Sequence, residues 1–468
     1  MLPTAALTSL WKDLELPTAA LSQVSLTGSD PVLPSSFAVG TCAQVSIAAS
    51  ALAAAELRRL RAGRTQSVSV DMRHAAVEFR SERYLRIDGQ PGGEIWDKFA
   101  GTYRCGDGRW VRLHTNFPHH REGVLAILGC AYDRAAVQAA LDGWNAVAFE
   151  DAAAAKGLVV TAMRTFGEWD AQPQGQALGT VPLIVLDPIG EARPEPLKPL
   201  PSAGTDGRPL AGVRVLDLTR IIAGPVCGRT LAAHGADVLL VTAPHLPAVR
   251  PLVIDTGRGK LSAQSDLRQA SGRSTLEGLL STADVFIQGY RPGGLERLGF
   301  GPDAAARLRP GIVYVTLSAY GHVGPWAGRR GYDSLVQTAS GFNAAEAEAA
   351  GRPEPRVLPC QALDHASGYL MAFGAMAGLH RRATQGGSWH VRVSLARTGL
   401  WLRSLGRVEN GQACPDPKLE DVQDLLETVD SGFGRLTTVR HAARMSETMP
   451  RWVRPSVPLG THEARWPA

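Results

Sequence analysis

The feature that most constrains the fold is a pair of apolar runs separated by a helix-like segment near the middle of the chain. The first run spans residues 213–218, a Gly-Pro corner follows at 224–225, and an Ala- and Leu-rich segment leads to the second run at 236–241. This order predicts a strand–loop–helix–strand unit of an open parallel sheet. Ligands of such sheets bind beyond the carboxyl ends of the strands, so we expect the chemistry at the loop after Leu218. The GxGxxG pattern of dinucleotide sites is missing here, which argues against an NAD-dependent oxidoreductase.

Length and composition narrow the class of protein. With 468 residues the chain is long enough for two or three domains. It has no run of about 18 apolar residues and begins without the basic and apolar regions of a signal peptide, so we expect no membrane association and a cytoplasmic location. Six scattered cysteines without a CxxC pair indicate reduced thiols. The net charge of +5 is dispersed, which disfavours nucleic-acid binding and suits a polyanionic small ligand.

The chain divides at a segment rich in Pro, Gly and Ala. Residues 188–211 lack periodicity and are interpreted as a linker. Before it, residues 96–187 predict a small α+β domain with a hairpin followed by helices. After it, residues 212–403 predict the sheet domain, and 404–468 a C-terminal tail.

An internal repeat organises the remaining residues, 1–95. Segments 41–76 and 364–399 both read as an apolar helix, a basic end, a turn and an alternating strand. In this register Thr41 aligns with Asp364. The first 95 residues are therefore interpreted as a half-copy without the acidic residue, in a permuted or partly duplicated chain. The alternative is an unrelated helical domain.

Several motifs resemble one known family. Asp217, Thr219, Gly224-Pro225 and the GADV run at 235–238 resemble the opening of family III coenzyme A transferases, the CaiB/BaiF group of formyl-CoA and carnitine CoA-transferases. The resemblance continues through AQSDLR, ADVFIQGYRPGGLERLGF, RRGYDSLVQTASG and ALDHASGYLMAFGAMAGLHRR, and the tail RWVRPSVPLGTHEARW resembles the closing segment of the family. It implies an α/β fold with an open, parallel, Rossmann-like sheet domain and a smaller α+β domain.

Asp364 is the predicted nucleophile. It opens an apolar helix, where unpaired backbone N–H groups and the helix dipole stabilise a carboxylate anion. An N-cap role is the alternative. The resemblance implies that Asp364 attacks an acyl-CoA thioester, forming an aspartyl anhydride and then an aspartyl-CoA thioester. Gly368 and Gly341 are candidate backbone donors to the oxyanion.

The resemblance also implies the coenzyme A site. The matching positions are Ile221, Ile222, Ser265, Asp266, Leu267, Arg268, Gly289, Tyr290, Arg291, Arg297, Arg330, Gly331, Tyr332 and Asp333. The arginines suit phosphate groups, since guanidinium binds phosphate through two parallel hydrogen bonds. Leu240, Thr242 and Ala243 depart from the family, which usually has K-V-E and then a basic residue, so this end of the site is expected to differ.

No metal site and no permanently bound cofactor are predicted. The cluster HTNFPHH at 114–120 has no carboxylate or Cys at ligand spacing. His114 is instead a candidate to reach the acyl group if the small domain closes over the site. Ser318 and Ser394 lack a GxSxG elbow, which disfavours a serine hydrolase.

The sequence therefore predicts transfer of CoA from an acyl-CoA donor to a carboxylic acid. One alternative is an α-methylacyl-CoA racemase, but relatives with that activity have His where this chain has Tyr332, and tyrosine is a poor base at neutral pH. Another alternative is a non-catalytic CoA-binding partner subunit. The resemblance implies an interlocked homodimer.

Overall fold

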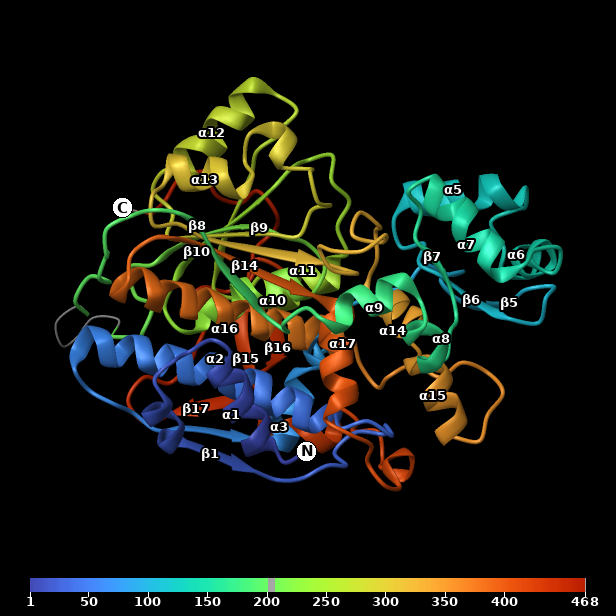
Figure 1. Ribbon diagram of the computed structural model, residues 1–468, viewed down its shortest axis with the longest axis horizontal. Helices are drawn as coiled ribbons and strands as arrows, with labels where there is room; N and C mark the ends of the chain where they lie inside the picture. Colours follow the sequence, from blue (N-terminus) through green and yellow to red (C-terminus); the bar gives the residue numbers. More distant parts are fainter. Residues whose placement is uncertain (201–206, 468) are drawn as a thin grey trace.

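A seven-stranded sheet forms the centre of the computed structural model, which describes residues 1–200 and 207–467 (Figure 1). All neighbouring strands pair in parallel except the last, which is antiparallel. In spatial order they are β11 (Lys260–Gln264), β10 (Asp237–Thr242), β9 (Arg214–Leu218), β12 (Val285–Gln288), β13 (Val313–Ser318), β14 (Ser388–Ser394) and β8 (Val185–Gly190). The predicted α/β class with an open, mostly parallel sheet is confirmed.

Helices cover both faces of this sheet (Figure 1). On one side lie α10 (Ala223–Ala233) and α16 (Ala362–Thr384), and on the other α12 (Ala270–Leu280) and α13 (Pro302–Leu308). Many of the strand residues are apolar and buried, because a sheet covered on both faces exposes neither to water. Gly368 lies where α10 crosses α16, and a Cβ there would come within 2.6 Å of the Ala223 carbonyl oxygen.

The strand order reverses between β9 and β12. The chain runs outward from β9 through β10 to β11, and then returns to β12 on the other side of β9. Such a switch point leaves a crevice at the carboxyl ends of the two central strands, because the connecting loops diverge to opposite sides. The loops beginning at Thr219 and Gly289 therefore frame the place where a ligand is expected.

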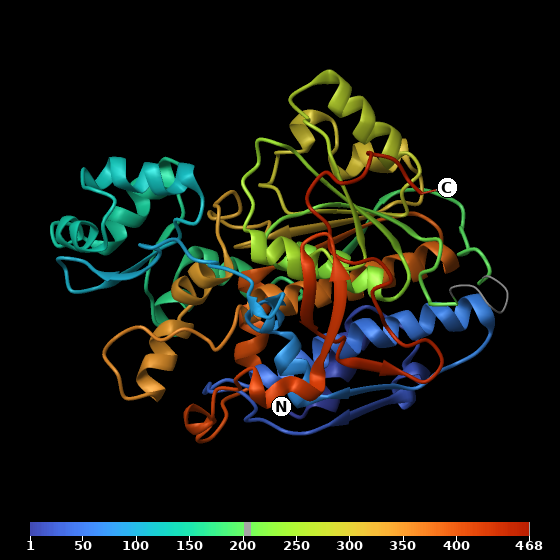
Figure 2. The same cartoon turned by 180° about the vertical axis from the view of Figure 1, so that it is seen from behind.

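The N-terminal segment matches the segment that contains Asp364 in the order of its elements. α2 (Val39–Ala62), β2 (Val68–Asp71) and α3 (Met72–Glu78) follow one another as α16, β14 and α17 (Leu395–Ser404) do. Asp71 caps α3 by accepting the N–H of His74, and Ser394 caps α17 by accepting the N–H of Arg397. The long helices α2 and α16 pack against each other. Figure 2 shows α2 beneath the sheet domain from behind. A permuted domain order remains a hypothesis.

α2 is long and apolar enough to cross a membrane by length and composition alone, the single helix of that kind within residues 1–200 and 207–467. Every residue in its apolar window is buried inside the protein. Its apolar character is therefore accounted for by packing: one side meets α16 and the others meet α1 (Pro3–Asp13), α3 and β2.

A small domain stands beside the sheet domain with its own apolar core (Figure 1). It consists of β5 (Gly101–Arg104), β6 (Trp110–Leu113), β7 (Val160–Ala162), α5 (Pro118–Leu128), α6 (Arg134–Leu141) and α7 (Ala146–Ala155). The predicted boundary between residues 187 and 188 falls inside β8. Since β8 pairs with β14, this strand belongs to the large sheet. Of the predicted linker, residues 201–206 lie outside the described residues.

The two ends of the chain meet in shared sheets. β17 (Ala443–Met445) pairs with β2, which also pairs with β1 (Val24–Thr27). A second sheet joins the C-terminal hairpin to the segment before the small domain, in the order β15 (Leu426–Ser431), β16 (Gly434–Val439), β3 (Arg86–Ile87) and β4 (Gln90–Pro91). The predicted tail is thus part of the folded body. The remaining elements are η1 (Thr18–Gln23), α4 (Ser81–Tyr84), α8 (Phe166–Asp170), α9 (Pro173–Gly179), α11 (Arg250–Thr256), η2 (Glu296–Leu298), α14 (Asp333–Ala339), α15 (Phe342–Ala349), η3 (Gly411–Ala413) and η4 (Glu420–Leu425).

Candidate active site

A buried ion pair shapes the loop after β9. The Asp217 carboxylate accepts hydrogen bonds from the Thr219 backbone N–H at 3.0 Å and the Thr219 hydroxyl at 2.5 Å. Lys260 on β11 donates to the other Asp217 oxygen at 2.8 Å. This arrangement fixes the turn so that Ile221 adopts φ = 76°, a conformation that costs a β-branched residue energy. Such strain is characteristic of functional loops.

Asp364 lies in the first turn of α16, and 7% of its surface is exposed. Its backbone N–H donates at 2.9 Å to the carboxylate of Asp333, which opens α14 and is buried. Gln337, one turn along α14, donates to the other Asp333 oxygen. Two carboxylates from neighbouring helix starts therefore face the same spot, and Asp333 holds the backbone at the predicted nucleophile.

Burial raises the pKa of both carboxyl groups. Desolvation is the largest cause for each, and the negative charge of Asp333 further raises the pKa of Asp364, with a smaller contribution from Glu82. The sequence had suggested the opposite for Asp364, because a helix N-terminus favours the anion. That expectation is wrong: removal from water and a second carboxylate outweigh the helix dipole.

A second acidic contact reaches α16 from the N-terminal segment. Glu82 of α4 lies 3.2 Å from His365 Nε2, and both side chains are buried. Phe79 stacks on the His365 ring with centroids 5.5 Å apart. The half-copy therefore contributes directly to the surroundings of the predicted nucleophile.

A cleft of about 1400 Å³, measured with its open mouth, lies above Asp364. Its charged lining is strongly cationic, with four arginines and a single carboxylate, that of Asp364. The lining residues are Phe117, His119, His120, Arg220, Ile221, Ile222, Ala223, Leu246, Pro247, Gly289, Tyr290, Arg291, Pro292, Gly294, Leu317, Ser318, Ala319, Arg329, Arg330, Gly331, Tyr332, Asp364 and Leu395. The cleft thus occupies the predicted switch point and suits an anionic ligand.

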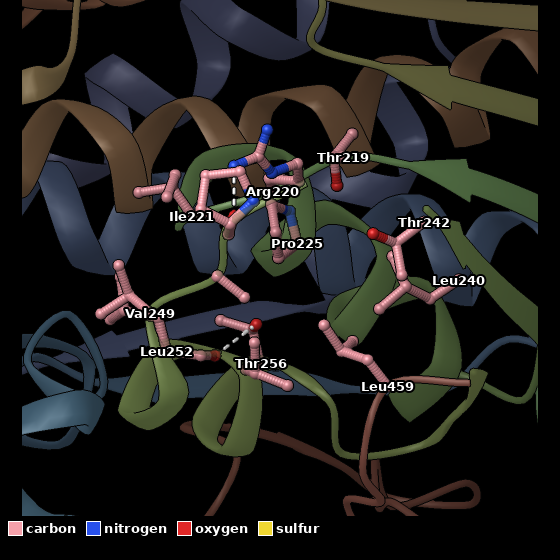
Figure 3. Close-up of a pocket in the computed structure, with 13 residues that line it drawn as sticks. Thr219, Arg220, Ile221, Pro225, Leu240, Thr242, Val249, Leu252, Thr256 and Leu459 are labelled. Atoms are coloured by element: carbon pink, nitrogen blue, oxygen red, sulfur yellow. Dashed lines mark hydrogen bonds between the residues drawn. The ribbon is translucent and has the colours of Figure 1, made fainter. Parts of the chain in front are cut away.

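Two smaller cavities adjoin the cleft on either side of β10. We call the first the β11 arm: it has a volume of about 710 Å³ and shares Leu246, Tyr290 and Gly294 with the cleft. Residues 265–268 line it together with apolar side chains, among them Leu218, Val241 and Leu295. We call the second the α11 arm: it has a volume of about 480 Å³ and shares Arg220, Ile221 and Pro247 with the cleft (Figure 3).

Most of the predicted coenzyme-binding residues are brought together. Those in the cleft are Ile221, Ile222, Gly289, Tyr290, Arg291, Arg330, Gly331 and Tyr332. The 265–268 group lines the β11 arm, where Arg268 pairs with Asp266 at 2.7 Å and lowers the pKa of that carboxyl to about 2. Two predicted residues stand apart from these linings. Asp333 is buried behind Asp364, and Arg297 is exposed on η2 beside Leu298 of the β11 arm.

The small domain closes one side of the cleft. Arg330 donates to the Gly157 carbonyl at 3.0 Å and lies 3.4 Å from His120 Nε2. Burial, with His119, His114 and nearby arginines, lowers the pKa of His120 to about 3. The sequence flagged the histidine cluster but did not place it opposite Arg330, because the contact spans 210 residues of chain.

Arg220 was missed as a site residue. It follows Thr219 directly beyond the carboxyl end of β9, which is the signal that would have found it. Its guanidinium donates to the Pro247 carbonyl and lies 5.1 Å from the centre of the Phe117 ring. Arg220 therefore bridges the loops after β9 and β10 and also contacts the small domain.

Tyr332 and His114 form a stacked pair beside the cleft. Their ring centroids are 3.9 Å apart with an angle of 11° between the planes. Burial raises the pKa of Tyr332 to about 12 and lowers that of His114 to about 3. His114 supports Tyr332 from behind and is not among the cleft's lining residues. Its contact with the acyl group depends on closure of the small domain and stays a prediction.

The two glycines predicted as oxyanion donors, Gly368 and Gly341, are not among the residues that line the cleft. Gly368 is buried inside α16, where it allows α10 to approach closely. Gly341, with φ = 99°, precedes α15 and lies against Phe166, where a Cβ would come within 2.6 Å of that residue's nitrogen. Close packing accounts for both glycines.

Known proteins resemble this chain over the same region. A family profile described as CoA-transferase family III matches residues 210–409. An acyl-CoA transferase of Gibberella moniliformis is 30% identical over 417 residues, covering 81% of this chain and 73% of the relative. The probable fatty acyl-CoA transferase Rv3272 of Mycobacterium tuberculosis is 34% identical over 45% of this chain and 58% of the relative.

Further relatives match shorter stretches. The succinyl-CoA:glutarate CoA-transferase of Mus musculus is 33% identical over 38% of this chain and 43% of its own length. The crystal structure of Rv3272 has 33% identity over 43% of this chain and 58% of that one, with a TM-score of 0.40. The chain thus spans about half the length of these two relatives. The extended match to the fungal transferase, together with the family profile, shows that the chain belongs to CoA-transferase family III.

Proposed function

We propose that this protein transfers CoA from an acyl-CoA thioester to a carboxylic acid, with Asp364 as the covalent nucleophile. The observation that carries the proposal is the position of Asp364: a carboxylate at the start of α16, opening into a cationic cleft at the switch point of the sheet. The relatives are named as CoA-transferases, which supports CoA transfer in general.

The chemistry is balanced without a metal or a nucleotide. The Asp364 carboxylate attacks the thioester carbonyl and the C–S bond breaks, giving an aspartyl–acyl anhydride and CoA thiolate. The thiolate attacks the aspartyl carbonyl, releasing the donor acid and leaving an aspartyl-CoA thioester. The acceptor carboxylate then attacks this thioester, and the returning thiolate takes the new acyl group and frees Asp364.

The contact between Asp333 and Asp364 influences the protonation state of the proposed nucleophile. Burial, with the added charge of Asp333 on Asp364, raises the pKa of the pair, so the pair tends to hold a proton, and the nucleophile is the ionised form of Asp364. Asp333 accepts hydrogen bonds from the Asp364 N–H and from Gln337, so Asp333 positions the nucleophile. Arg220 and Arg330 at the cleft favour the anionic substrates that must approach.

The racemase alternative needs a second acid or base beside Asp364. Tyr332 stands where racemase relatives have His, and its pKa of about 12 keeps it protonated at neutral pH. This argues against proton abstraction by that residue.

The test is capture of the covalent intermediate. Purified protein is mixed with a panel of acyl-CoA donors and quenched with hydroxylamine or borohydride, and its peptides are analysed by mass spectrometry. We expect modification on the Asp364 peptide, absent in Asp364→Asn. Asp303→Asn is the matched control, since Asp303 is an exposed carboxylate in the first turn of α13. Tight CoA binding without labelling by any donor would favour a racemase or a non-catalytic partner subunit instead.

Location and assembly complete the proposal. The scattered cysteines favour a cytoplasmic location, and the family resemblance favours an interlocked homodimer. Light scattering of the purified chain measures the mass. A monomer would mean that the half-copy supplies within one chain what the second subunit provides in an interlocked pair.

A further inference from the structure

The small domain borders the cleft above Asp364 with the first turn of α5. Phe117, His119 and His120 line the cleft, and α5 begins at Pro118, directly after Phe117. Among the described residues, no side chain caps this helix start. The backbone N–H groups of a first turn have no acceptor within the helix, and together with the helix dipole they favour an anion.

His120 adds a buried donor that has no acceptor. Its side chain is 2% exposed, and burial above all lowers its pKa to about 3, so the ring is neutral at neutral pH. The Arg330 guanidinium donates to His120 Nε2 at 3.4 Å, which leaves the ring proton on Nδ1. Within residues 1–200 and 207–467, His120 Nδ1 has no hydrogen-bond partner. A buried N–H without an acceptor costs free energy, and an anion in the cleft would supply that acceptor.

Two arginines beside His119 have no carboxylate partner. Arg220 and Arg330 donate to backbone carbonyls, and neither forms an ion pair in the part of the chain that the structure describes. After burial, which is the larger cause, the charges of both arginines lower the pKa of His119. The neighbouring Arg329 differs, because Asp151 accepts its hydrogen bond at 3.1 Å. The positive charge near the start of α5 is therefore available to a ligand.

These groups together form a cluster that we call the α5 anion site. It consists of the first turn of α5 with His119, His120, Arg220 and Arg330. Tyr332 links this cluster to Asp364, since its ring centroid lies 6.3 Å from that of His120. Burial raises the pKa of Tyr332 to about 12, and the charges of both arginines and of Asp364 also act on that pKa. The α5 anion site therefore lies at the Asp364 end of the cleft.

We propose that the α5 anion site binds an anionic group of the acid, so that the acids exchanged are dicarboxylic. The inference deepens the proposed function and rests on it. When a thioester lies at Asp364, the pantetheine arm carries the CoA phosphates away, toward residues 265–268, which are predicted to bind CoA and line the β11 arm. An anion beside Tyr332 then belongs to the acyl side of the thioester. The reacting carboxylate is engaged at Asp364, so the α5 anion site holds a second carboxylate.

A binding experiment with two matched thioethers tests this without relying on turnover. The probes are S-(3-carboxypropyl)-CoA and S-butyl-CoA, in which a terminal carboxylate replaces a methyl group, titrated calorimetrically into the full-length protein. We expect the carboxylate probe to bind at least about tenfold tighter, because hydrogen bonds to a charged group are stronger than neutral ones. Equal affinity of the wild type for both probes would overturn the inference.

Three variants locate the effect. Arg330→Met should reduce the preference to within about threefold and leave the affinity for S-butyl-CoA within about threefold. His119→Leu changes an exposed side chain, so it serves if Arg330→Met fails to fold, and it should reduce the preference at least about threefold. Arg329→Met is the matched control: this arginine also lines the cleft but is paired with Asp151, so the preference should persist. A preference that neither Arg330→Met nor His119→Leu reduces, or equal weakening of both probes, would overturn the inference, and equal weakening would assign the site to a CoA phosphate.

Failure of the proposed function would look different. If the carboxylate probe binds tighter and Arg330→Met removes this preference, but no acyl-CoA labels Asp364, the α5 anion site stands and the transferase chemistry fails. If Asp364 is labelled and the two probes bind alike, the chemistry stands and the α5 anion site has no part in substrate selection.

Discussion

The two long helices that pack together, α2 and α16, both begin beside an aspartate that accepts backbone N–H groups, but their surroundings differ. Asp333 accepts the N–H of Asp364 at the start of α16, and Asp30 accepts the N–H groups of Gly40 and Thr41 at the start of α2. In α2 the Thr41 hydroxyl also donates to the Asp30 carboxylate at 2.7 Å, so this hydroxyl is uncharged and hydrogen-bonded. In α16 the aligned residue is Asp364, and its carboxylate is repelled by that of Asp333.

The surroundings differ as much as the residues do. Asp30 and Val32 cover the start of α2 so closely that a Cβ on Gly40 would come within 2.5 Å of both side chains. The start of α16 borders the cleft of about 1400 Å³. One local design thus gives a closed, stable helix start in the first copy and an open, electrostatically strained one in the second. The comparison shows that the second copy differs from the first in two respects: it has an acidic residue at the aligned position, and its helix start borders a cleft.

Removing the nucleophile is the strongest way to separate the two copies. Asp364→Asn should reduce transfer at least about a thousandfold, because the covalent step has no other carboxylate in the cleft. Thr41→Ala should leave transfer within about twofold. Steady-state exchange between an acyl-CoA and a free acid measures both. Substantial exchange by Asp364→Asn would remove Asp364 from the mechanism.

Making the first copy resemble the second should destabilise it. Thr41→Asp places a carboxylate beside Asp30 at a covered helix start and should cost about 3 kcal/mol of unfolding free energy at pH 8. The loss should shrink at pH 4, where the pair can hold a proton. Urea unfolding at both pH values measures it. Thr41→Asn is the isosteric control, and an equal loss with Asn would show that shape rather than charge is responsible.

Removing the repulsion between Asp333 and Asp364 in the second copy should stabilise the protein. The pKa values of Asp333 and Asp364 are raised in the fold, so the pair's contribution to stability is present at low pH and is lost as pH rises. Asp333→Asn should therefore match wild type near pH 4 and melt about 2 °C higher at pH 8. Calorimetry checks this. A variant less stable than wild type at pH 8 would contradict the raised pKa.

The same substitution should change the pH dependence of the chemistry. Without the Asp333 charge the pKa of Asp364 falls, so labelling of Asp364 by an acyl-CoA should begin at lower pH than in wild type. Labelling rates from pH 5 to pH 9 test this. An onset displaced to higher pH would show that Asp333 assists ionisation of Asp364.

The smallest expected effect belongs to Glu82. Its charge also raises the pKa of Asp364, but less than that of Asp333, so Glu82→Gln should move the onset of labelling in the same direction and by less. Glu427→Gln, a carboxylate of the C-terminal hairpin, is the control. A pH profile identical to wild type would show that Glu82 acts on His365 alone.

Local pattern predicted much of the framework. The apolar runs around Gly224-Pro225 became β9, α10 and β10, and the alignment of Thr41 with Asp364 matched two helices that begin at equivalent residues. Chain order also predicted the loop after Leu218 as part of the ligand site. These features depend on side-chain periodicity and on turn residues. Both involve residues close together in the sequence, so they can be identified from the sequence alone.

What the sequence alone determined was therefore the α/β class, the helix–strand repeat and the identity of the residue at the start of α16. The tertiary structure decided the chemistry of that residue. Asp333 lies 31 positions before Asp364 in the chain, and Glu82 reaches His365 across 283 residues. A helix dipole is a local property, whereas desolvation and repulsion depend on what distant segments bring close. That is why the sequence suggested a lowered pKa for Asp364 and the folded protein raises it.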